Sequence, residues 1–251
     1  MPKLSVTIIT KNESSNISAV LESVAWADEV VVVDCGSTDE TVSIAKRFTD
    51  RVSFHKWEGY GIQKNHAAGL AENDWILSVD ADERVSPELG KEIRECLANN
   101  PQHFGYRIPR VNYYLDRWIK STDWYPDYQL RLYDRRVATW NTRLVHESLN
   151  VKGKIGILKN DLQHYAYQSL SDHLATIDRY TTLAAQQMYT QGQRASWLNL
   201  TIHPQLAFLR NYALRFGFRE GLSGLVISLM NAYYVFLKMA KLWELQRRGP
   251  Y

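Results

Sequence analysis

The sequence predicts an α/β fold in which a mostly parallel sheet is flanked by helices and followed by a helical segment. Short β-branched runs alternate with stretches of helical spacing over residues 1–100, which is typical of an open parallel sheet. Beyond residue 170 the spacing of apolar residues is helical. A chain of 251 residues that is 45% hydrophobic can bury one sizeable core. We therefore expect one domain at residues 1–165, with halves at 1–100 and 101–165, and a helical segment at 166–251.

The chain begins with a strand, a helix and a second strand. The run at 4–10 is short and β-branched, as in a strand that is covered on both faces. Apolar residues at 17–24 have helical spacing, and Ser14 or Ser15 is available as the N-cap. The run at 29–34 is again apolar and β-branched. This order predicts a right-handed crossover between parallel strands.

The pattern then repeats. Ser37 and Glu40 have the spacing of a capping box before a helix at 42–48. The next elements are a short strand at 52–55, a helix through 67–70 and an apolar strand at 75–80. From residue 104 to 162 the chain is rich in aromatic residues and arginine, with alternating runs such as 129–133. Such runs predict antiparallel strands and loops.

The C-terminal segment indicates contact with a membrane surface. Residues 222–237 are nearly uncharged, and these sixteen residues fall just short of the length that crosses a bilayer. Upstream, apolar and aromatic residues at 206–218 are mixed with Arg210, Arg215 and Arg219, which suits an anionic leaflet. The pattern favours a segment that lies on the membrane or dips into it. The alternative is a helical hairpin packed on the rest of the chain or on a second subunit, as in a homo-oligomer.

Composition and motifs argue against several classes of protein. A net charge of +3 gives no general footprint for nucleic acid. Cys35 and Cys96 lie far apart without metal-ligand spacing, which argues against a disulfide framework or structural zinc and fits a reducing cytosol. No secretory signal is visible, so we expect a cytoplasmic working face. Neither a P-loop nor a GxGxxG after the first strand is present, so a P-loop kinase and a dinucleotide-dependent oxidoreductase are unsupported.

Polar side chains close three of the predicted strands, namely Thr10, Asp34 and Asp80. In an open parallel sheet, ligands bind beyond the carboxyl ends of the strands. These residues, with Lys11 and Glu13 in the loop after the first strand, therefore predict a binding site at one edge of the sheet. Taken alone, Asp34 is equally consistent with a turn residue that caps its own loop.

Asp80 and Asp82 are the sharpest candidates of this edge. Carboxylates one residue apart on the loop after a strand can reach one hard cation that also bridges two phosphates. Mg²⁺ or Mn²⁺ suits such oxygen ligands. Lys64, on the loop at 61–65, either neutralises a diphosphate as a point charge or is a solvated lysine. Glu83 either supports this site or lies at the surface.

Three ordered motifs resemble those of a known family. Residues 6–13 read VTIITKNE, residues 32–41 read VVDCGSTDET and residues 77–83 read LSVDADE. In these motifs, which span about its first third, the chain resembles the inverting family 2 glycosyltransferases of GT-A fold. The resemblance implies transfer of a sugar from a nucleotide diphosphate donor, assisted by a divalent metal.

The resemblance also implies roles for individual residues. Thr10 and Glu13, with Lys11 between them, would line the nucleoside pocket, Asp34 would hold the base, Lys64 would lie near the phosphates, and Asp80 with Asp82 would hold ribose and metal. The general base of this family is usually the aspartate of an acidic pair that precedes a leucine–arginine strand. Here that position is Asp127, although Pro126 replaces the first acidic residue.

Asp127 also has a chemical argument in its favour. In-line displacement needs a carboxylate on the side of the sugar opposite the departing diphosphate, close enough to take the proton of the acceptor hydroxyl. Asp123 is the competing candidate. Trp124 and Tyr125 lie in the same aromatic stretch at 118–128, where sugar rings commonly stack, so this half is expected to face the acceptor. The alternative is a core aromatic cluster with an incidental surface aspartate.

His146 and Glu147 are adjacent and either complete the metal shell or position the acceptor. They do not form an HExxH motif, so a zinc hydrolase is unsupported. A histidine that is satisfied by hydrogen bonds in the core is the alternative. Arg131 belongs to a group of arginines that contact phosphates on the acceptor or form a solvated face; the others are Arg135, Arg136 and Arg143.

The C-terminal end, with GFREG at 217–221, resembles the lipopolysaccharide core beta-1,4-glucosyltransferase subgroup. That resemblance implies glucose from UDP-glucose, a lipid-linked saccharide as acceptor, and a peripheral position on the inner face of the cytoplasmic membrane. Two rival functions fit parts of the pattern. A sugar-nucleotide nucleotidyltransferase needs a glycine-rich basic loop after the first strand, and residues 10–13 contain no glycine. A non-catalytic membrane scaffold would tolerate changes at Asp80, Asp82 and Asp127.

Overall fold

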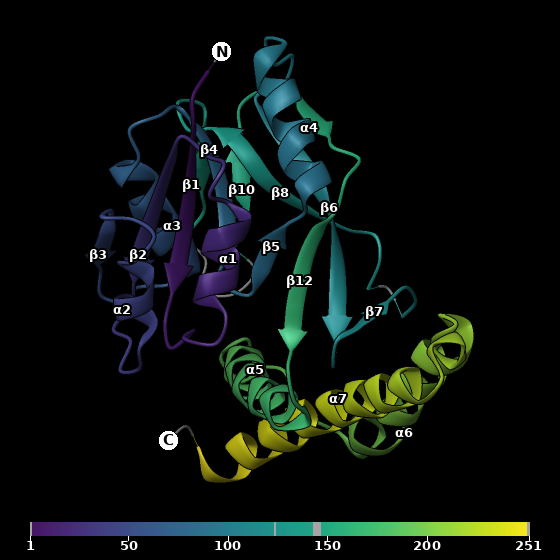
Figure 1. Ribbon diagram of the computed structural model, residues 1–251. Coiled ribbons are helices and arrows are strands. Elements are labelled where there is room, and N and C mark those ends of the chain that lie inside the picture. Colours follow the sequence, from purple (N-terminus) through teal and green to yellow (C-terminus); the bar gives the residue numbers. More distant parts are fainter. Residues whose placement is uncertain (1, 123, 143–146, 250–251) are drawn as a thin grey trace. The chain divides into compact units, whose positions relative to one another are not determined.

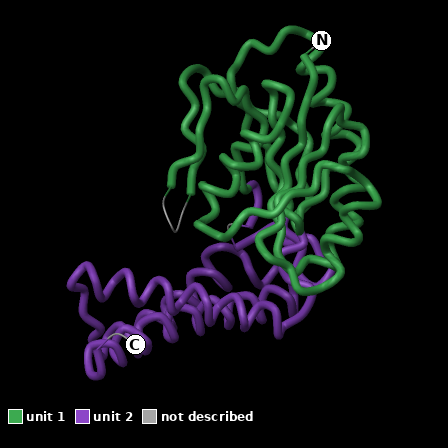
Figure 2. The backbone as a smooth tube through the Cα atoms, turned by 90° about the vertical axis from the view of Figure 1, so that its left-hand side faces the viewer, with its two compact units in different colours: residues 1–111, 127–164 green, residues 112–126, 165–251 purple. Residues whose placement is uncertain are grey.

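The computed structural model describes residues 2–122, 124–142 and 147–249 (Figure 1). The chain divides into two compact units (Figure 2). Unit 1 comprises residues 1–111 and 127–164, and unit 2 comprises residues 112–126 and 165–251. Two strands, β6 (Gly105–Tyr114) and β12 (Leu162–Tyr167), contribute residues to both units.

Four parallel strands form the first half of the unit 1 sheet, as the sequence predicts. They are β1 (Leu4–Thr10), β2 (Glu29–Asp34), β3 (Val52–Phe54) and β4 (Trp75–Asp80), in the order β3-β2-β1-β4. The strands β1, β2 and β4 are buried over most of their length, because apolar side chains point to both faces of the sheet. A mixed sheet results once the antiparallel strands are added.

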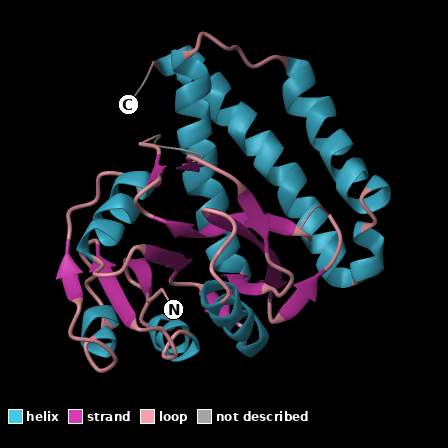
Figure 3. Cartoon of the chain, turned by 90° about the horizontal axis from the view of Figure 1, so that it is seen from above, coloured by secondary structure: helices cyan, strands magenta, loops and turns pink. Residues whose placement is uncertain are grey.

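Helices cover both faces of the parallel strands (Figure 3). On one face, α1 (Ile17–Ser23) and α4 (Pro87–Ala98) share a core cluster with side chains of β1 and β4. On the other face, α3 (Tyr60–Leu70) shares a second cluster with side chains of β2. The predicted N-cap of the first helix is wrong, because α1 follows Asn16 rather than either serine and has no side-chain cap hydrogen bond.

The predicted capping box of Ser37 and Glu40 is also wrong. The Ser37 hydroxyl donates a hydrogen bond to the Asp34 carboxylate instead. The helix that follows, α2 (Thr41–Ala45), has no side-chain cap and is shorter than the expected helix at 42–48. A local turn around Asp34 therefore competes successfully for the serine side chain.

Antiparallel strands extend the sheet beyond β4, as the alternating runs predict. β8 (Asp127–Asp134) pairs with β4, and β6 pairs with β8. β12 follows β6 in the sheet, and β5 (Glu83–Val85) pairs with β12 so that Glu83 lies opposite His164. The remaining strands are β7 (Arg117–Ile119) and β11 (Ile155–Ile157), which pair with β6, and β9 (Ala138–Trp140) and β10 (Leu149–Val151), which form a separate pair.

Unit 2 contains three long helices, α5 (Leu170–Thr190), α6 (Trp197–Leu209) and α7 (Leu222–Arg248). Ser169 and Ser196 cap α5 and α6, because each hydroxyl accepts a hydrogen bond from a backbone N–H in the first turn. α5 and α7 pack through a buried apolar cluster that includes Ala185, Leu242 and Leu245. The helical character predicted beyond residue 170 is thus confirmed.

α7 extends well past the nearly uncharged run at 222–237. It has 27 residues, and within the described part of the chain it is the one helix long and apolar enough to cross a membrane, with 17% of its most apolar window buried. The sixteen-residue count therefore underestimates this helix. Gly224 lets α7 approach the preceding turn, because a Cβ at this position would lie 1.8 Å from the carbonyl oxygen of Gly217.

Candidate active site

The carboxyl ends of β1, β2 and β4 bring three of the predicted site residues to one edge of the sheet. Thr10 pairs in register with Asp34, and Ile9 pairs with Asp80. The Asp34 carboxylate accepts hydrogen bonds from the backbone N–H groups of Gly36 at 2.8 Å and Ser37 at 2.9 Å. Asp34 therefore stabilises its own turn, as the alternative interpretation proposed, while it lies at the edge where a ligand is expected.

The loop after β1 is tied to the loop after β2. The backbone N–H of Asn12 donates to Ser37 Oγ at 2.8 Å, and the Asn12 side chain accepts from the Thr38 N–H at 2.8 Å. Asn12 has a φ of 56°, which orients it for both contacts. Within this loop the Lys11 side chain is exposed. Burial raises the pKa of Glu13, although the hydrogen bond that Asn16 donates to its carboxylate lowers it in part. The two loops that flank the predicted nucleotide site thus form one connected rim.

A row of alternating charges crosses unit 1 from α3 to the start of β8. We call it the charge row, and its members in order are Lys64, Asp80, Arg131, Glu83, Arg110 and Asp127. Lys64 Nζ lies 3.1 Å from Asp80 Oδ1, and Arg131 contacts the other oxygen of Asp80. Glu83 Oε1 accepts from Arg131 Nη2 at 2.7 Å and from Arg110 Nη1 at 3.1 Å. Each charge of the row therefore has a neighbour of opposite sign.

Burial makes these pairings decisive for protonation. The side chains of Glu83 and Arg131 are 0% and 4% exposed. Burial opposes ionisation of Asp80, but the charges of Arg131 and Lys64 outweigh it and hold the pKa of Asp80 well below its usual range. Burial likewise opposes the charge of Arg131, yet Asp80 and Glu83 raise its pKa. Asp80 and Arg131 are therefore both ionised at neutral pH.

Asp127 stands at the end of the row and is held by two donors. Arg110 donates to its Oδ2 through Nε at 2.9 Å and Nη2 at 2.6 Å, and Gln129 Nε2 donates to its Oδ1 at 2.7 Å. The Asp127 side chain remains 28% exposed. A carboxylate that is oriented by a guanidinium and still reaches solvent has the properties that a general base needs.

Asp82 has a different partner from Asp80. Its Oδ2 lies 3.2 Å from His164 Nε2, and the two side chains are 33% and 16% exposed. A carboxylate oxygen and an imidazole nitrogen are both ligands of divalent cations, and a partly exposed pair leaves positions for oxygen atoms of a ligand. Among the residues that the structure describes, no three histidine, cysteine or acidic side chains form a metal cluster. Asp82 and His164 therefore fit two of the ligands of a divalent metal ion.

The sequence suggested that Lys64 lies in a loop or is solvated, and the structure shows neither. Lys64 lies in α3 with 3% of its side chain exposed, 3.1 Å from Asp80, 3.5 Å from Glu147 and 4.7 Å from the Trp140 ring centroid. Gly61 makes this position accessible, because a Cβ there would lie 1.8 Å from the carbonyl oxygen of Asn141. Lys64 thus joins Asp80 and Glu147, two of the predicted site residues.

The remaining predicted residues fall elsewhere. Asp123 and His146 lie outside the described residues. Trp124 and Tyr125 belong to unit 2. Trp124 packs edge-on against Tyr114, with 5.8 Å between the ring centroids. For Trp124 this contact fits the alternative interpretation, a core aromatic cluster. The solvated-face interpretation of the arginine group is wrong for Arg131, because its guanidinium is buried between Asp80 and Glu83.

Three residues of the site were not selected from the sequence. Glu83 was left between two interpretations, and the structure places it at the buried centre of the charge row. Arg110 and His164 carried no motif. Arg110 lies in a run of alternating apolar residues that indicates a partly buried strand. A charged residue in such a strand needs a partner of opposite charge, and this requirement could have marked Arg110 as a site residue. His164 reaches Asp82 only through the pairing of β5 with β12, which no local pattern encodes.

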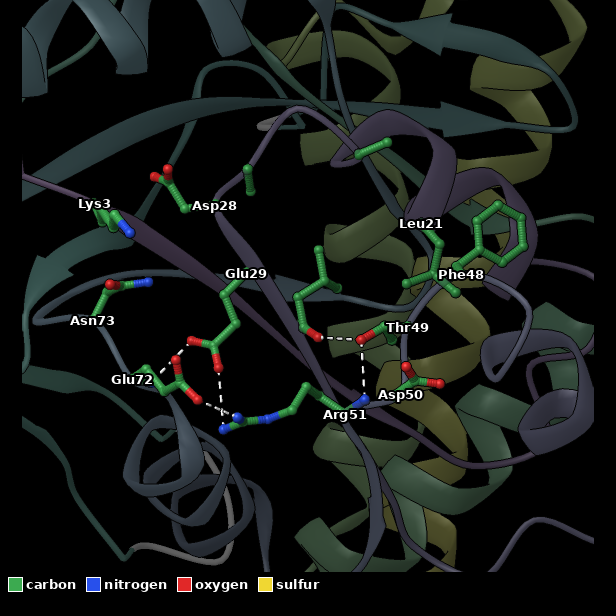
Figure 4. Close-up of a pocket in the computed structure, with 13 residues that line it drawn as sticks. Lys3, Leu21, Asp28, Glu29, Phe48, Thr49, Asp50, Arg51, Glu72 and Asn73 are labelled. Carbon is green, nitrogen blue, oxygen red and sulfur yellow. Dashed lines mark hydrogen bonds and ion pairs between the residues drawn. The ribbon is translucent and has the colours of Figure 1, made fainter.

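The opposite edge of the parallel strands carries a separate pocket of about 550 Å³ (Figure 4). Its lining includes Lys3, Glu29 and Asn73 at the starts of the strands. Arg51 is paired with Glu29 at 3.1 Å and contacts Glu72. None of the predicted site residues that the structure describes lines this pocket.

Comparisons with known proteins identify the family of the chain. Residues 5–165 match the family model described as Glycosyl transferase family 2. An uncharacterized glycosyltransferase of Rickettsia typhi is 34% identical over 262 residues, covering 99% of this chain and 89% of that protein. The lipopolysaccharide core biosynthesis glycosyltransferase LpsC of Rhizobium meliloti is 30% identical over 253 residues, covering 97% of this chain and 94% of LpsC.

Solved structures add a likeness of fold. The crystal structure of residues 1–349 of S. aureus TarS in complex with UDP-GlcNAc aligns with a TM-score of 0.50 and 16% sequence identity. The alignment covers 99% of this chain and 93% of that one. The two chains therefore share their overall architecture.

Proposed function

The chain belongs to glycosyl transferase family 2 and has the GT-A fold, and on that premise we propose that it transfers a hexose to a lipid-linked saccharide with inversion. Glucose from UDP-glucose is the proposed donor and the lipopolysaccharide inner core the proposed acceptor class. One observation carries the proposal: Asp80, Asp82 and Asp127 are held at or beyond the carboxyl edge of the parallel strands by distinct, specific partners.

In the proposed reaction, the acceptor hydroxyl gives its proton to Asp127 while its oxygen attacks the anomeric carbon. The bond between that carbon and the diphosphate breaks on the opposite face, and the nucleotide diphosphate leaves with the bonding electron pair. Arg110 and Gln129 would orient the Asp127 carboxylate for this proton transfer. Thr10, Lys11, Glu13 and Asp34 would bind the nucleoside.

Asp80 and Asp82 would divide the work at the diphosphate. Asp80 is neutralised by Lys64 and Arg131, which suits a role in binding ribose through its partly exposed carboxylate. Asp82 and His164 would hold Mg²⁺ or Mn²⁺, which supplies positive charge to the departing diphosphate when bound. His146 remains a weaker candidate ligand. Glu147 would fix Lys64. The acceptor roles that the sequence suggests for Arg131, Trp124, Tyr125, Asp123 and Glu147 stay predictions.

Unit 2 supports a membrane location for the acceptor. LpsC carries lipopolysaccharide core biosynthesis in its name, and an acceptor of that class is anchored in a membrane. Several apolar side chains of α6 and α7 are exposed, among them Trp197 at 69%, Leu206 at 55% and Leu222 at 75%. Such a face can enter the headgroup region of a bilayer. We propose a peripheral enzyme on the cytoplasmic face, with pairing of the helices of two copies as the other use of this surface.

Isothermal titration of UDP and of GDP, each with and without Mn²⁺, tests the donor site. The wild type should bind UDP in a metal-dependent manner, and Asp82→Ala should lose the metal dependence. Asp28→Ala, which changes a carboxylate of the opposite pocket, is the matched control and should bind like the wild type. Binding of neither nucleotide by the wild type would contradict the proposed donor site, and binding of GDP alone would exclude UDP-glucose.

A further inference from the structure

A pocket of about 1000 Å³ lies wholly within unit 2. It is lined by residues of the segments 116–122 and 214–220 and by Tyr125. Its charged lining residues are Arg117, Lys120, Arg215 and Arg219, against Asp116 and Glu220. Among the residues that the structure describes, the lining has four basic and two acidic side chains. The reaction proposed above uses none of these six charged residues, and of the other lining residues it uses Tyr125 alone.

Glu220 is occupied inside the wall of the pocket. Its side chain is 9% exposed, its Oε1 accepts from the backbone N–H of Lys120 at 2.9 Å, and its Oε2 lies 3.7 Å from Arg117. Among the residues that the structure describes, it makes no ion pair with the side chains of Lys120 or Arg219. Glu220 thus forms part of the wall, and the charges of Lys120 and Arg219 are left for another anion.

Those two cations are held above aromatic rings. Lys120 Nζ lies 4.3 Å from the Trp118 ring centroid, and Arg219 Cζ lies 4.5 Å from the Phe216 ring centroid. An aromatic face orients a cation but attracts it by only about 0.5 to 1 kcal/mol at an exposed site. Lys120 and Arg219 are both exposed. Their charge is therefore positioned and still available.

Two further donors in the same lining lack partners. Trp118 Nε1 and Ser121 Oγ are buried and hydrogen-bond to none of the residues described. Leaving buried polar groups unsatisfied is costly. A ligand with several acceptor oxygens would offer them partners after a small adjustment of the lining. A phosphoryl group has three such oxygens and a charge that matches the two cations.

The rim of the pocket is apolar. Leu214 and Phe216 line it with 71% and 49% of their surface exposed, and Phe218 and Leu222, which follow in the chain, are 49% and 75% exposed. A free sugar phosphate has no apolar part that would cover these side chains. A phosphorylated headgroup at the surface of a bilayer would place its phosphate in the pocket and its acyl chains beside the rim.

We propose that this pocket binds the phosphoryl group of an anionic membrane lipid. The choice of a lipid-borne phosphate rests on the membrane location proposed above, whereas the phosphate chemistry rests on the pocket itself. Bound in this way, the phosphate anchors unit 2 to the surface that carries the acceptor. The pocket is then a specificity site for anionic lipids, separate in its residues from the donor site.

Vesicle sedimentation tests the proposal, with phosphatidylcholine vesicles compared with vesicles containing phosphatidic acid. The wild type should bind more tightly when phosphatidic acid is present. The Lys120→Ala/Arg219→Ala variant should lose about thirtyfold in that affinity, which corresponds to two headgroup contacts. The control is Arg179→Ala/Arg194→Ala, which removes two exposed arginines over Tyr180 and Tyr189 of the same unit and should lose less than about threefold.

Equal losses in the two double variants would overturn the proposal, because general surface charge would then explain the binding. Glucose 6-phosphate tests for a soluble ligand. If it binds the wild type but not Lys120→Ala/Arg219→Ala, while the two proteins bind vesicles equally, the pocket takes a soluble phosphate and a lipid ligand is excluded. UDP binding should be the same in all three proteins. A wild type that fails to bind UDP would contradict the proposed function, and the vesicle comparison would still decide the pocket.

Discussion

Units 1 and 2 hold their charges in opposite ways. In unit 1, the six members of the charge row neutralise one another, and Glu83 and Arg131 are buried between their partners. In unit 2, Lys120 and Arg219 are exposed, lie over aromatic rings and stand beside exposed apolar side chains. The first arrangement fixes geometry, and the second offers a surface. Substitution of Glu83 should therefore act mainly on stability, whereas substitution of Lys120 and Arg219 should act mainly on binding.

The strongest test of this difference is Glu83→Gln. Removing the charge leaves Arg110 and Arg131 without their shared carboxylate in a buried position, so we expect the free energy of unfolding to fall by about 3 to 5 kcal/mol. Urea denaturation measures the change. Lys91→Ala, which breaks an exposed pair with Glu95, should cost less than about 0.5 kcal/mol. Equal costs would show that the charge row is not a structural element.

His173 tests whether unit 2 has a core of its own. Burial lowers the pKa of His173 to about 4, and its Nδ1 lies 3.1 Å from the Tyr114 hydroxyl. As the pH falls, His173 takes up its proton in the unfolded chain before it does so in the folded chain. Its contribution to the free energy of unfolding is therefore complete above about pH 6.5 and is lost as the pH falls towards 4, by roughly 3 kcal/mol in total. Urea denaturation at pH 7 and pH 4.5 should show this loss in the wild type. His173→Phe should lack it, and an unchanged pH dependence in that variant would refute the assignment.

Two glycines of α3 provide a matched pair for unit 1. A Cβ at Gly61 would meet the carbonyl oxygen of Asn141, so Gly61→Ala should push α3 away and cost about 1 to 3 kcal/mol. A Cβ at Gly69 would meet nothing within 4 Å, so Gly69→Ala should be neutral or stabilise by up to about 1 kcal/mol. Because Gly61 lies one turn before Lys64, its variant should also bind UDP more weakly. Similar stabilities of the two variants would contradict the close approach.

The smallest effect on stability is expected at the exposed apolar face of unit 2. Trp197→Ser with Leu206→Ser removes two large exposed side chains and should change the free energy of unfolding by less than about 0.5 kcal/mol. Binding to phosphatidylcholine vesicles should nevertheless weaken, because these side chains would enter the headgroup region. Sedimentation with vesicles measures this. Unchanged vesicle binding would assign the face to contacts between copies instead.

The sequence predicts the parallel half of the sheet well, because its information is local. The apolar runs that became β1, β2 and β4 are long enough to specify strands by themselves, and their polar last residues mark the edge where ligands bind. These predictions needed only the order of residues along a strand. Asp127, the first residue of β8, was instead selected through the resemblance to the family.

The rest of the site depends on pairing between distant segments. Glu83 and Arg110 meet only because β5 and β6 enter the same sheet, and His164 reaches Asp82 through the pairing of β12 with β5. Lys64 was expected in a loop, because glycine and polar residues at 59–65 hide the helix that the close approach of Gly61 permits. The spacing of residues along the chain does not predict such contacts.

The role of Asp127 is the central claim, and Asp127→Asn tests it most directly. The change keeps the size of the side chain and removes the ability to take a proton at neutral pH. We expect UDP-glucose binding within about twofold of the wild type, whereas transfer to a lipopolysaccharide core acceptor should fall by about 10²- to 10⁴-fold. A variant that binds the donor and transfers glucose at a rate within a few-fold of the wild type would contradict the claim.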